Sequence, residues 1–216
     1  VAGAGLVLRT LLNLIAVDVG FDADHLVLFE ISPPARRYPG PKDVRLHQQL
    51  EQRIASLPGV EHISPGSIPY ISQNMTNADF FPEGELPDPK PKHAEDENTV
   101  GINFFPTLGI PIVAGRGFGP QDTSTSTKVG IINQSLARKR FPNTNPLGKR
   151  FKADRETSDW IQIVGICADT RYADLRGNPP AQFFLPYVQQ PEVGTLTYQV
   201  RTHMQPSALF PALRSV

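Results

Sequence analysis

The segment PKDVRLHQQLEQRIASL, residues 41–57, predicts a helix and sets the frame for the rest of the fold. Its apolar residues recur at spacings of four, four and three, which places them on one helix face: Leu46, Leu50, Ile54 and Leu57. Pro41 suits the first helical turn, because that position needs no backbone N–H donor. Pro58 and Gly59 then end the helix.

Extended segments flank this helix on both sides. Residues 25–31, HLVLFEI, predict one strand, and a second strand begins at residues 60–64. Together with the helix they form a compact strand–helix–strand unit over residues 25–68. Near the other end of the chain, residues 195–200 predict a strand and Pro206 opens a helix. A second strand–helix unit therefore closes the sequence.

The region between these two units has mostly β character. Strands are expected around residues 79–81, 99–103, 110–113, 129–132, 146–151, 160–166 and 182–185. Two short helical segments interrupt them, at 104–109 with a glycine stop and at 133–141 with Asn133 as N-cap. Residues 82–91 are rich in proline and predict an exposed, stiff loop. The whole pattern favours an α+β fold, a split βαβ unit with a large β-rich insertion.

The first segment, residues 1–17, carries an apolar helical face but also Arg9, Thr10 and Asn13. Two interpretations stay open: the end of a truncated membrane helix that runs into a stalk, or an amphipathic helix packed on the domain. Because the sequence starts at Val1 within an apolar stretch, we expect a piece of a longer polypeptide. The expected division is 1–20 as membrane helix end and stalk, 21–68 plus 193–216 as the βαβ subdomain, and 69–192 as the inserted β-rich subdomain.

The amino-acid composition excludes several kinds of function and site. The 216 residues hold 21 basic and 21 acidic side chains, so the formal net charge is zero and the clustered cations that bind nucleic acid are missing. The chain has 22 prolines, which favours short elements joined by stiff turns. Cys167 is the one cysteine, which excludes an internal disulfide and any multi-cysteine metal site.

Candidate catalytic and ligand-binding patterns all have a simpler structural interpretation. His93 with Glu95, Asp96 and Glu97 offers metal-ligand atom types, but the stretch predicts a solvated loop. Gly115–Gly119 and Gly148–Lys149 resemble phosphate-binding loops, yet each lacks a required residue and predicts a turn. Cys167 predicts a small strand residue, and the run Arg138–Arg140 predicts a solvated face, with a phosphate contact as the minor alternative. We therefore predict no catalytic, cofactor-binding or metal-binding residues.

A series of short motifs, in order along the chain, resembles a known family. The motifs are residues 3–11 with 17–22, Leu57–Val60, Phe105–Pro111 with Gly115–Phe118 and Gln121–Asp122, Ile131–Arg138 with Phe141–Pro142 and Pro146–Arg150, Ile163–Gly165 with Asp169 and Arg171, and Phe184–Tyr187. They resemble the extracytoplasmic domain of MacB-like, FtsX-type ABC transporter permeases, in particular the duplicated-permease branch without a known substrate. The likeness covers essentially the whole chain.

The resemblance carries expectations about fold and function. It implies a porter-like βαβ subdomain with an inserted β-rich one, in a permease of the bacterial inner membrane with this segment in the periplasm. The domain would be non-catalytic and would transmit ATP-driven motion of the membrane helices. The implied partners are the rest of the permease chain, an ABC ATPase subunit and, as in MacB itself, a periplasmic adaptor and an outer-membrane channel.

Two other functions stay open from the sequence. The first is a stand-alone periplasmic module that binds a peptide or lipid in the groove between the two subdomains. The second is a small hydrolase that uses carboxylates not recognisable from sequence.

Overall fold

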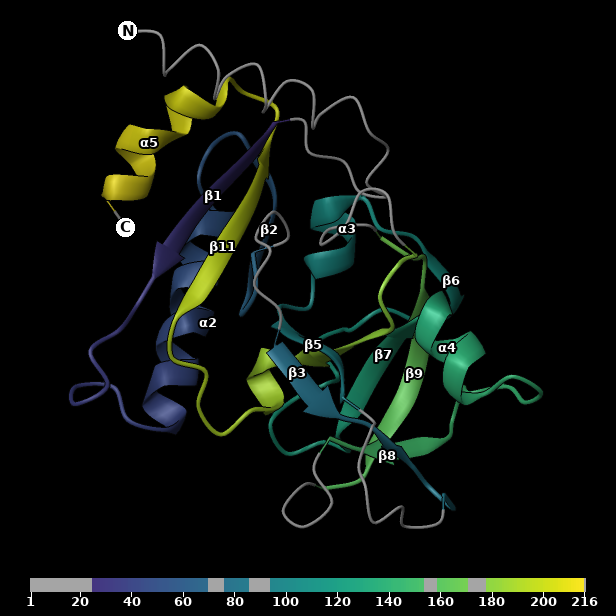
Figure 1. The fold of residues 1–216 in the computed structure, drawn as a ribbon. Helices are drawn as coiled ribbons and strands as arrows, with labels where there is room; N and C mark the ends of the chain where they lie inside the picture. Colours follow the sequence, from purple (N-terminus) through teal and green to yellow (C-terminus); the bar gives the residue numbers. More distant parts are fainter. Residues whose placement is uncertain (1–24, 70–75, 86–93, 154–158, 171–177, 216) are drawn as a thin grey trace, which may run out of the picture.

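The computed structural model describes residues 25–69, 76–85, 94–153, 159–170 and 178–215, and it shows a mixed α+β fold (Figure 1). The strands are β1 (Leu26–Ile31), β2 (Val60–Gly66), β3 (Thr76–Asp79), β4 (Phe81–Pro82), β5 (Ala94–Val100), β6 (Ile112–Gly115), β7 (Val129–Asn133), β8 (Arg150–Lys152), β9 (Ile161–Cys167), β10 (Gln182–Pro186) and β11 (Leu196–Thr202). The helices are α2 (Pro41–Ala55), α3 (Phe104–Leu108), α4 (Gln134–Arg140), the 3₁₀ turn η1 (Tyr187–Gln189) and α5 (Pro206–Arg214).

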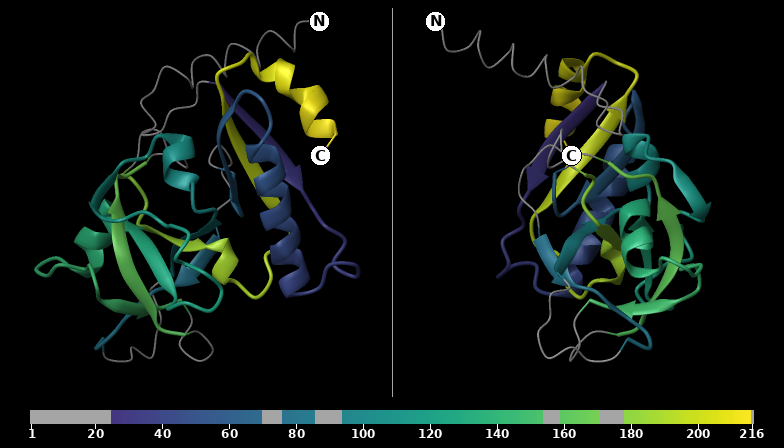
Figure 2. Two further views of the ribbon diagram at one scale, coloured as in Figure 1. Left: turned by 180° about the vertical axis from the view of Figure 1, so that it is seen from behind. Right: turned by 45° about the vertical axis from the view of Figure 1, so that its right-hand side comes forward.

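The first and last described strands build the split βαβ unit. β11 lies between β1 and β2 and runs antiparallel to both, so β1 and β2 are parallel and α2 is the crossover between them. Helix α2 lies along one face of these three strands, as Figure 2 shows from behind. Helix α5 follows β11, as expected from the strand–helix pattern near residue 206. The predicted α+β class with a split βαβ unit is thus confirmed.

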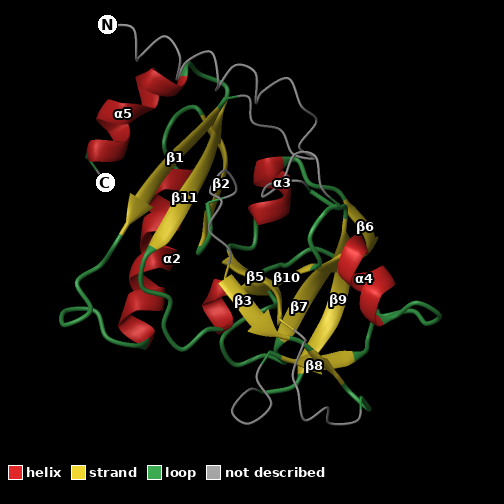
Figure 3. Ribbon diagram, in the orientation of Figure 1, coloured by secondary structure: helices red, strands yellow, loops and turns green. Residues whose placement is uncertain are grey.

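The remaining strands continue the same sheet. The strand order is β1-β11-β2-β5-β10-β7-β9-β8-β4, while β3 pairs with β5 and β6 with β9. Strands β10 and β5 are parallel, as are β7 and β9, and α4 connects β7 to the following β8 (Figure 3). The link between the split βαβ unit and the rest is narrow, because β2 and β5 pair through Gly66 and Val100. We call the strands from β3 to β10 the β-rich part.

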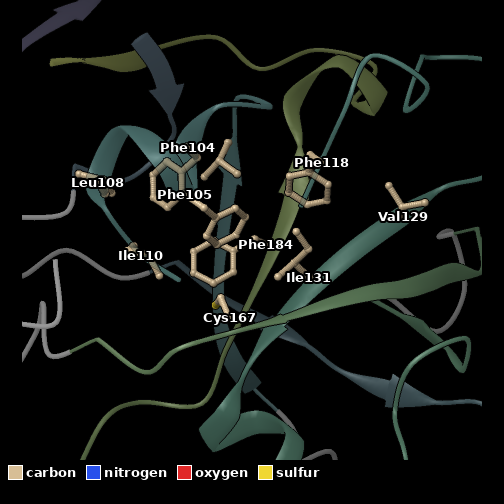
Figure 4. Packing of buried hydrophobic residues seen from close by; sticks show 10 residues of the cluster. Phe104, Phe105, Leu108, Ile110, Phe118, Val129, Ile131, Cys167 and Phe184 are labelled. Carbon is tan, nitrogen blue, oxygen red and sulfur yellow. The ribbon is translucent and has the colours of Figure 1, made fainter. Parts of the chain in front are cut away.

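The buried apolar residues form three clusters. One lies between α2 and the split βαβ strands: Val27, Val44, Ile54, Ile63, Tyr187, Leu196, Tyr198, Val200 and Leu209. A second lies beneath α3 and is rich in phenylalanine, with the rings of Phe105 and Phe184 in an edge contact at 5.1 Å. Figure 4 shows Cys167 among these side chains. The third surrounds Phe80, Phe151 and Phe183 on the other side of the β-rich part.

The buried face of helix α2 overlaps the predicted apolar stripe and extends beyond it. Ile54 is buried, Leu50 and Leu57 are half-buried and pack against the same core, and Leu46 is half-buried. The fully buried positions of the first turns are instead Asp43, Val44 and His47, two of them polar. A polar residue can occupy such a position when its hydrogen bonds are satisfied inside the protein, which a pattern of apolar residues does not reveal.

The acidic stretch around residue 95 was predicted as a solvated loop, and this prediction is wrong. Ala94–Val100 form β5, an internal strand paired with β10 and β3. Glu95 is 3% exposed because Lys139 and Arg140 of α4 neutralise it, with Nζ–Oε2 and Nε–Oε1 distances of 2.8 and 3.0 Å. The short strand expected at 79–81 is in fact two strands, β3 and β4. His93 lies outside the described residues.

The prediction for the first segment, residues 1–20, also falls outside the part of the chain that the structure describes. Among the described helices, none is long and apolar enough to cross a membrane. The division at residues 68/69 and 192/193 stays a prediction, although Tyr187 and Val188, from the predicted insertion, pack in the core beside α2.

Candidate functional site

An open groove of about 810 Å³ separates α2 from the β-rich part. Helix α2 contributes one wall with Pro41, Val44, Arg45 and Gln48. The β-rich part contributes the other wall, with Glu97 of β5, Leu185 of β10 and Ile161 of β9, and η1 lies at its base with Val188 and Gln189. The groove therefore lies between the split βαβ unit and the β-rich part, and ligand binding in it stays a prediction.

Gln189 fixes the base of the groove. Its amide nitrogen donates to Thr123 O, Ser126 Oγ and Thr127 O at 3.0–3.1 Å, and its amide oxygen accepts from the backbone N–H of Val129 at 3.0 Å. The ammonium group of Lys128 donates to the backbone oxygen of Gln189. A buried glutamine with all these partners holds the 123–129 segment against η1, so the base of the groove is rigid.

Behind the groove, α2 carries a polar stripe at positions four apart: Asp43 and His47, which are buried, and Glu51, which is half-buried. Asp43 Oδ2 accepts from the backbone N–H groups of Val193 and Gly194 at 2.9 and 2.7 Å, which ties the loop before β11 to the first turn of α2. These bonds satisfy two backbone donors of a half-buried loop.

His47 is fully buried and lies between two partners. Its Nε2 is 2.8 Å from Gly194 O, and its Nδ1 is 2.8 Å from the hydroxyl of Tyr198. Burial lowers the pKa of His47, which outweighs the opposing effect of the bond to Gly194 and of the Asp43 charge, so the imidazole is neutral at neutral pH. In this state Nε2–H donates to Gly194 O and Nδ1 accepts from Tyr198, which satisfies both ring nitrogens.

Glu51 continues the stripe to the junction with the β-rich part. Tyr187 of η1 donates its hydroxyl to Glu51 Oε2 at 2.6 Å, and the other carboxyl oxygen, Oε1, is buried and has no hydrogen-bond partner among the described residues. Burial raises the pKa of Glu51 to about 7, although the bond from Tyr187 acts in the opposite direction. A carboxyl with this pKa changes its charge within the ordinary pH range.

The other predicted site candidates have structural roles. Cys167 is 1% exposed, and burial raises the pKa of its thiol, so it is an unreactive strand residue as expected. Arg116 forms a bidentate pair with Asp122 at 2.7 and 2.8 Å, and this pair closes the turn that resembled a phosphate loop. The cationic run of α4 is solvated at Arg138 and Lys139, as expected, while Arg140 is largely buried; Arg138 pairs with Asp169, and Lys139 and Arg140 pair with Glu95.

Sequence reasoning did not identify the polar stripe of α2. Its spacing of four residues is visible in the sequence, but charged residues at such spacing are usually solvated. The stripe could have been found only by pairing its polar side chains with Tyr187 of η1 and Tyr198 of β11, which contact Glu51 and His47. Across the described residues there is no cluster of three or more His, Cys, Asp or Glu side chains arranged to hold a metal ion.

Comparisons with known proteins agree on one family. The family model for the MacB-like periplasmic core domain matches residues 7–215. Over 79 residues the sequence is 25% identical to the macrolide export ATP-binding/permease protein MacB of Aggregatibacter actinomycetemcomitans, a match that covers 37% of this chain and 12% of that protein. The matched stretch thus spans about an eighth of the length of this relative.

Solved structures show the same fold at low sequence identity. The periplasmic region of MacB from Actinobacillus actinomycetemcomitans aligns over 93% of this chain and 86% of its own, with a TM-score of 0.57 and 14% identity. A domain of a putative permease from Porphyromonas gingivalis aligns over 76% and 66%, with a TM-score of 0.51 and 19% identity. The extracellular domain of the noncanonic ABC-type transporter YknZ from Gram-positive bacteria aligns over 87% and 88%, with a TM-score of 0.51 and 14% identity.

Proposed function

The chain belongs to the family of MacB-like periplasmic core domains, and from this premise we propose that it is the extracytoplasmic part of an ABC transporter permease that transmits ATP-driven motion. The observation that carries the proposal is the family match over residues 7–215, almost the whole sequence. In this role the domain itself catalyses no reaction, and hydrolysis of ATP belongs to a separate ATPase subunit or domain.

The packing of the described residues supports a mechanical role. Each of the two parts has its own dense apolar core, and they meet through the Gly66–Val100 pair, through α3 against β2 and β11, and through the contact of η1 with α2. Arg201 of β11 adds a buried bond to Thr107 O of α3 at 2.8 Å. Close-packed bodies joined by a few contacts move as rigid units, which suits the transmission of a displacement.

The proposed partners follow from the same role. They are the remainder of a permease chain and an ABC ATPase subunit, in the bacterial inner membrane with this domain in the periplasm. A periplasmic adaptor and an outer-membrane channel are further proposed partners. Gene neighbourhood together with co-purification of the complete permease would identify which of them are present.

A distance measurement in the complete permease tests the mechanical role. Spin labels placed on Arg45 of α2 and on exposed Ser124 of the opposite groove wall report the width of the groove, and one label on each copy of the domain reports the separation of the copies. We expect at least one of these distances to change when the ATPase subunit binds ATP, and the change to disappear in an ATPase variant that cannot bind nucleotide. Identical distances in all nucleotide states would contradict the proposal.

A binding module is the second candidate, and the groove is the observation that favours it. A groove of about 810 Å³ lies within the usual size of ligand sites, and its walls combine apolar residues with Arg45, Glu97 and Lys128. A peptide or lipid that binds there would raise the unfolding temperature in a saturable way. Gln48→Trp, which fills the α2 wall, serves as the control and should abolish that rise. If neither a peptide nor a lipid gives a saturable rise in the unfolding temperature, the binding role is contradicted and only the mechanical role remains.

A further inference from the structure

Strand β5 carries two glutamates on one face, because side chains two residues apart on a strand point the same way. Glu95 is buried and is neutralised by Lys139 and Arg140 of α4. Glu97 is half-buried and lines the groove. Among the residues that the structure describes, no lysine or arginine forms an ion pair with Glu97. The first glutamate thus has its cations within the chain, whereas the second meets the groove without one.

The surroundings of Glu97 suit a long cationic side chain. Its carboxylate is partly removed from water, and such a group gains most from a charged partner that also donates hydrogen bonds. Leu185 of β10 and Ile161 of β9 line the same groove, and Leu185 pairs in register with Thr99, two residues beyond Glu97. A lysine or arginine side chain matches both features, because its aliphatic stem packs on apolar residues while its charged end binds a carboxylate.

The remaining lining of the groove favours a peptide over a lipid. Arg45 of α2 lies on one wall, and Glu97 and Asp159 lie on the other. The acyl chains of a lipid would lie against these charges, and an anionic headgroup would meet two carboxylates. A peptide backbone instead offers donors and acceptors at every residue, and the amide of Gln48 on α2 can bind either kind.

We propose that the groove binds an extended peptide through a lysine or arginine side chain, whose charged end pairs with Glu97 and whose stem packs on Leu185 and Ile161. The cation of the ligand then does for Glu97 what Lys139 and Arg140 do for Glu95. This inference rests on the binding role proposed for the groove and adds the chemistry that the groove selects. Glu97 is in this view the residue that determines specificity.

Amide NMR titrations of the full 216-residue chain at about pH 8 test the inference. The probes are capped peptides that differ only in the central side chain: acetyl-Leu-Lys-Leu-amide and its counterparts with glutamine or glutamate at the centre. We expect saturable shifts at groove residues such as Glu97, Leu185 and Val188. The lysine peptide should bind roughly tenfold more tightly than the glutamine peptide, and the glutamate peptide should bind most weakly.

Three variants assign the preference to one carboxylate. Glu97→Gln should remove the preference for lysine over glutamine, and Glu97→Lys should favour the glutamate peptide, which a purely structural role of Glu97 would not cause. Glu30→Gln is the matched control, because Glu30 of β1 is an exposed glutamate that does not line the groove. It should keep the wild-type preference. Amide shifts outside the groove that match those of the wild type show that each variant is folded.

The outcomes separate this inference from the binding role on which it rests. Equal affinities for the lysine and glutamine peptides, or a preference that survives in Glu97→Gln, would overturn the inference and leave the groove as a binding site. Monomeric lyso-phosphatidylglycerol that shifts the same groove residues and displaces the lysine peptide would overturn it too, because the groove would then be a lipid site. If no probe gives saturable shifts, the binding role itself is contradicted, and this inference falls with it.

Discussion

At the scale of single residues, Glu51 makes stability depend on pH with a definite sign. Its pKa is about 7 in the folded protein and 4.5 in the unfolded chain, so the folded protein holds the proton more tightly. The free energy of unfolding should therefore fall as pH rises from 4.5 to 7, by on the order of 2–3 kcal/mol. Urea titrations across this range should show the fall in wild type and its loss in Glu51→Gln. Parallel curves for the two proteins would contradict the assignment.

Asn133 performs three tasks with one side chain. Its Oδ1 caps α4 by accepting from Leu136 N at 2.9 Å and also accepts from Gln182 N of β10 at 3.0 Å, while its Nδ2 donates to Pro180 O at 2.7 Å. We expect Asn133→Ala to cost about 2–3 kcal/mol of unfolding free energy, more than the ~1 kcal/mol of a simple cap. Asn133→Ser is the matched variant, since serine can cap the helix but cannot reach Pro180. Its cost in chemical denaturation should be intermediate, whereas a cost of only ~1 kcal/mol for alanine and almost none for serine would refute the added role of the long-range bonds.

At the scale of elements, the sequence identified the apolar strands and missed the polar ones. Residues 161–167 alternate between buried and half-buried positions along β9, and such a run of β-branched residues is recognisable locally. Strand β5 is not recognisable locally, because the burial of Glu95 depends on Lys139 and Arg140, which lie 44 and 45 residues further along the chain. The candidate site shows the same contrast between a feature visible in the sequence and one that depends on distant residues. Its groove could be placed between the two parts from their order, but the stripe of α2 depends on Tyr187 and Tyr198, which lie more than a hundred residues further along.

Strand β9 needs a glycine at residue 165, where the backbone just after β6 approaches it closely. A Cβ on Gly165 would lie 2.2 Å from Arg116 O, so Gly165→Ala must push the two backbones apart. We expect a loss of more than about 2 kcal/mol and faster amide exchange in β6, whose pairing depends on this approach. Gly148→Ala is the control: its φ of +81° is strained for alanine, but no atom lies within 4 Å. It should cost about 1 kcal/mol and leave exchange in β6 unchanged. Gly165 itself has no positive φ, so a cost for Gly165→Ala no larger than that of Gly148→Ala would contradict the role of the close approach.

At the scale of the whole molecule, the apolar clusters show where one part ends and the other begins. All buried members of the cluster beside α2 come from residues 27–63 and 187–209, whereas the other two clusters draw theirs from residues 80–185. The cluster beside α2 includes Tyr187, whereas the boundary predicted at 192/193 assigns Tyr187 to the insertion. Tyr187 contributes a fully buried ring to the first core and its hydroxyl to Glu51.

This grouping predicts how the chain can be shortened. Gly66 pairs with Val100, and Val100 pairs with Pro186, so the ends of the β-rich part lie two strand spacings, about 10 Å, apart. A linker of about five glycine and serine residues spans that distance and can replace residues 67–186. The shortened chain keeps the complete core beside α2, and we expect it to retain the α2 helix and to unfold cooperatively, with reduced stability because it is small and has lost α3.

The matched experiment places the cut at the boundaries expected from sequence. Replacing residues 69–192 removes Tyr187 and Val188, which leaves a cavity in the core and Glu51 without its hydrogen-bond donor. A lost aromatic side chain costs about 3–5 kcal/mol, which is comparable to the whole stability of so small a domain. Circular dichroism and amide NMR dispersion should therefore show a folded protein for the first cut and an unfolded or molten one for the second. If the second chain folds as well as the first, η1 belongs to the insertion and the anchoring role of Tyr187 is wrong; if neither folds, the two parts are not separable cores.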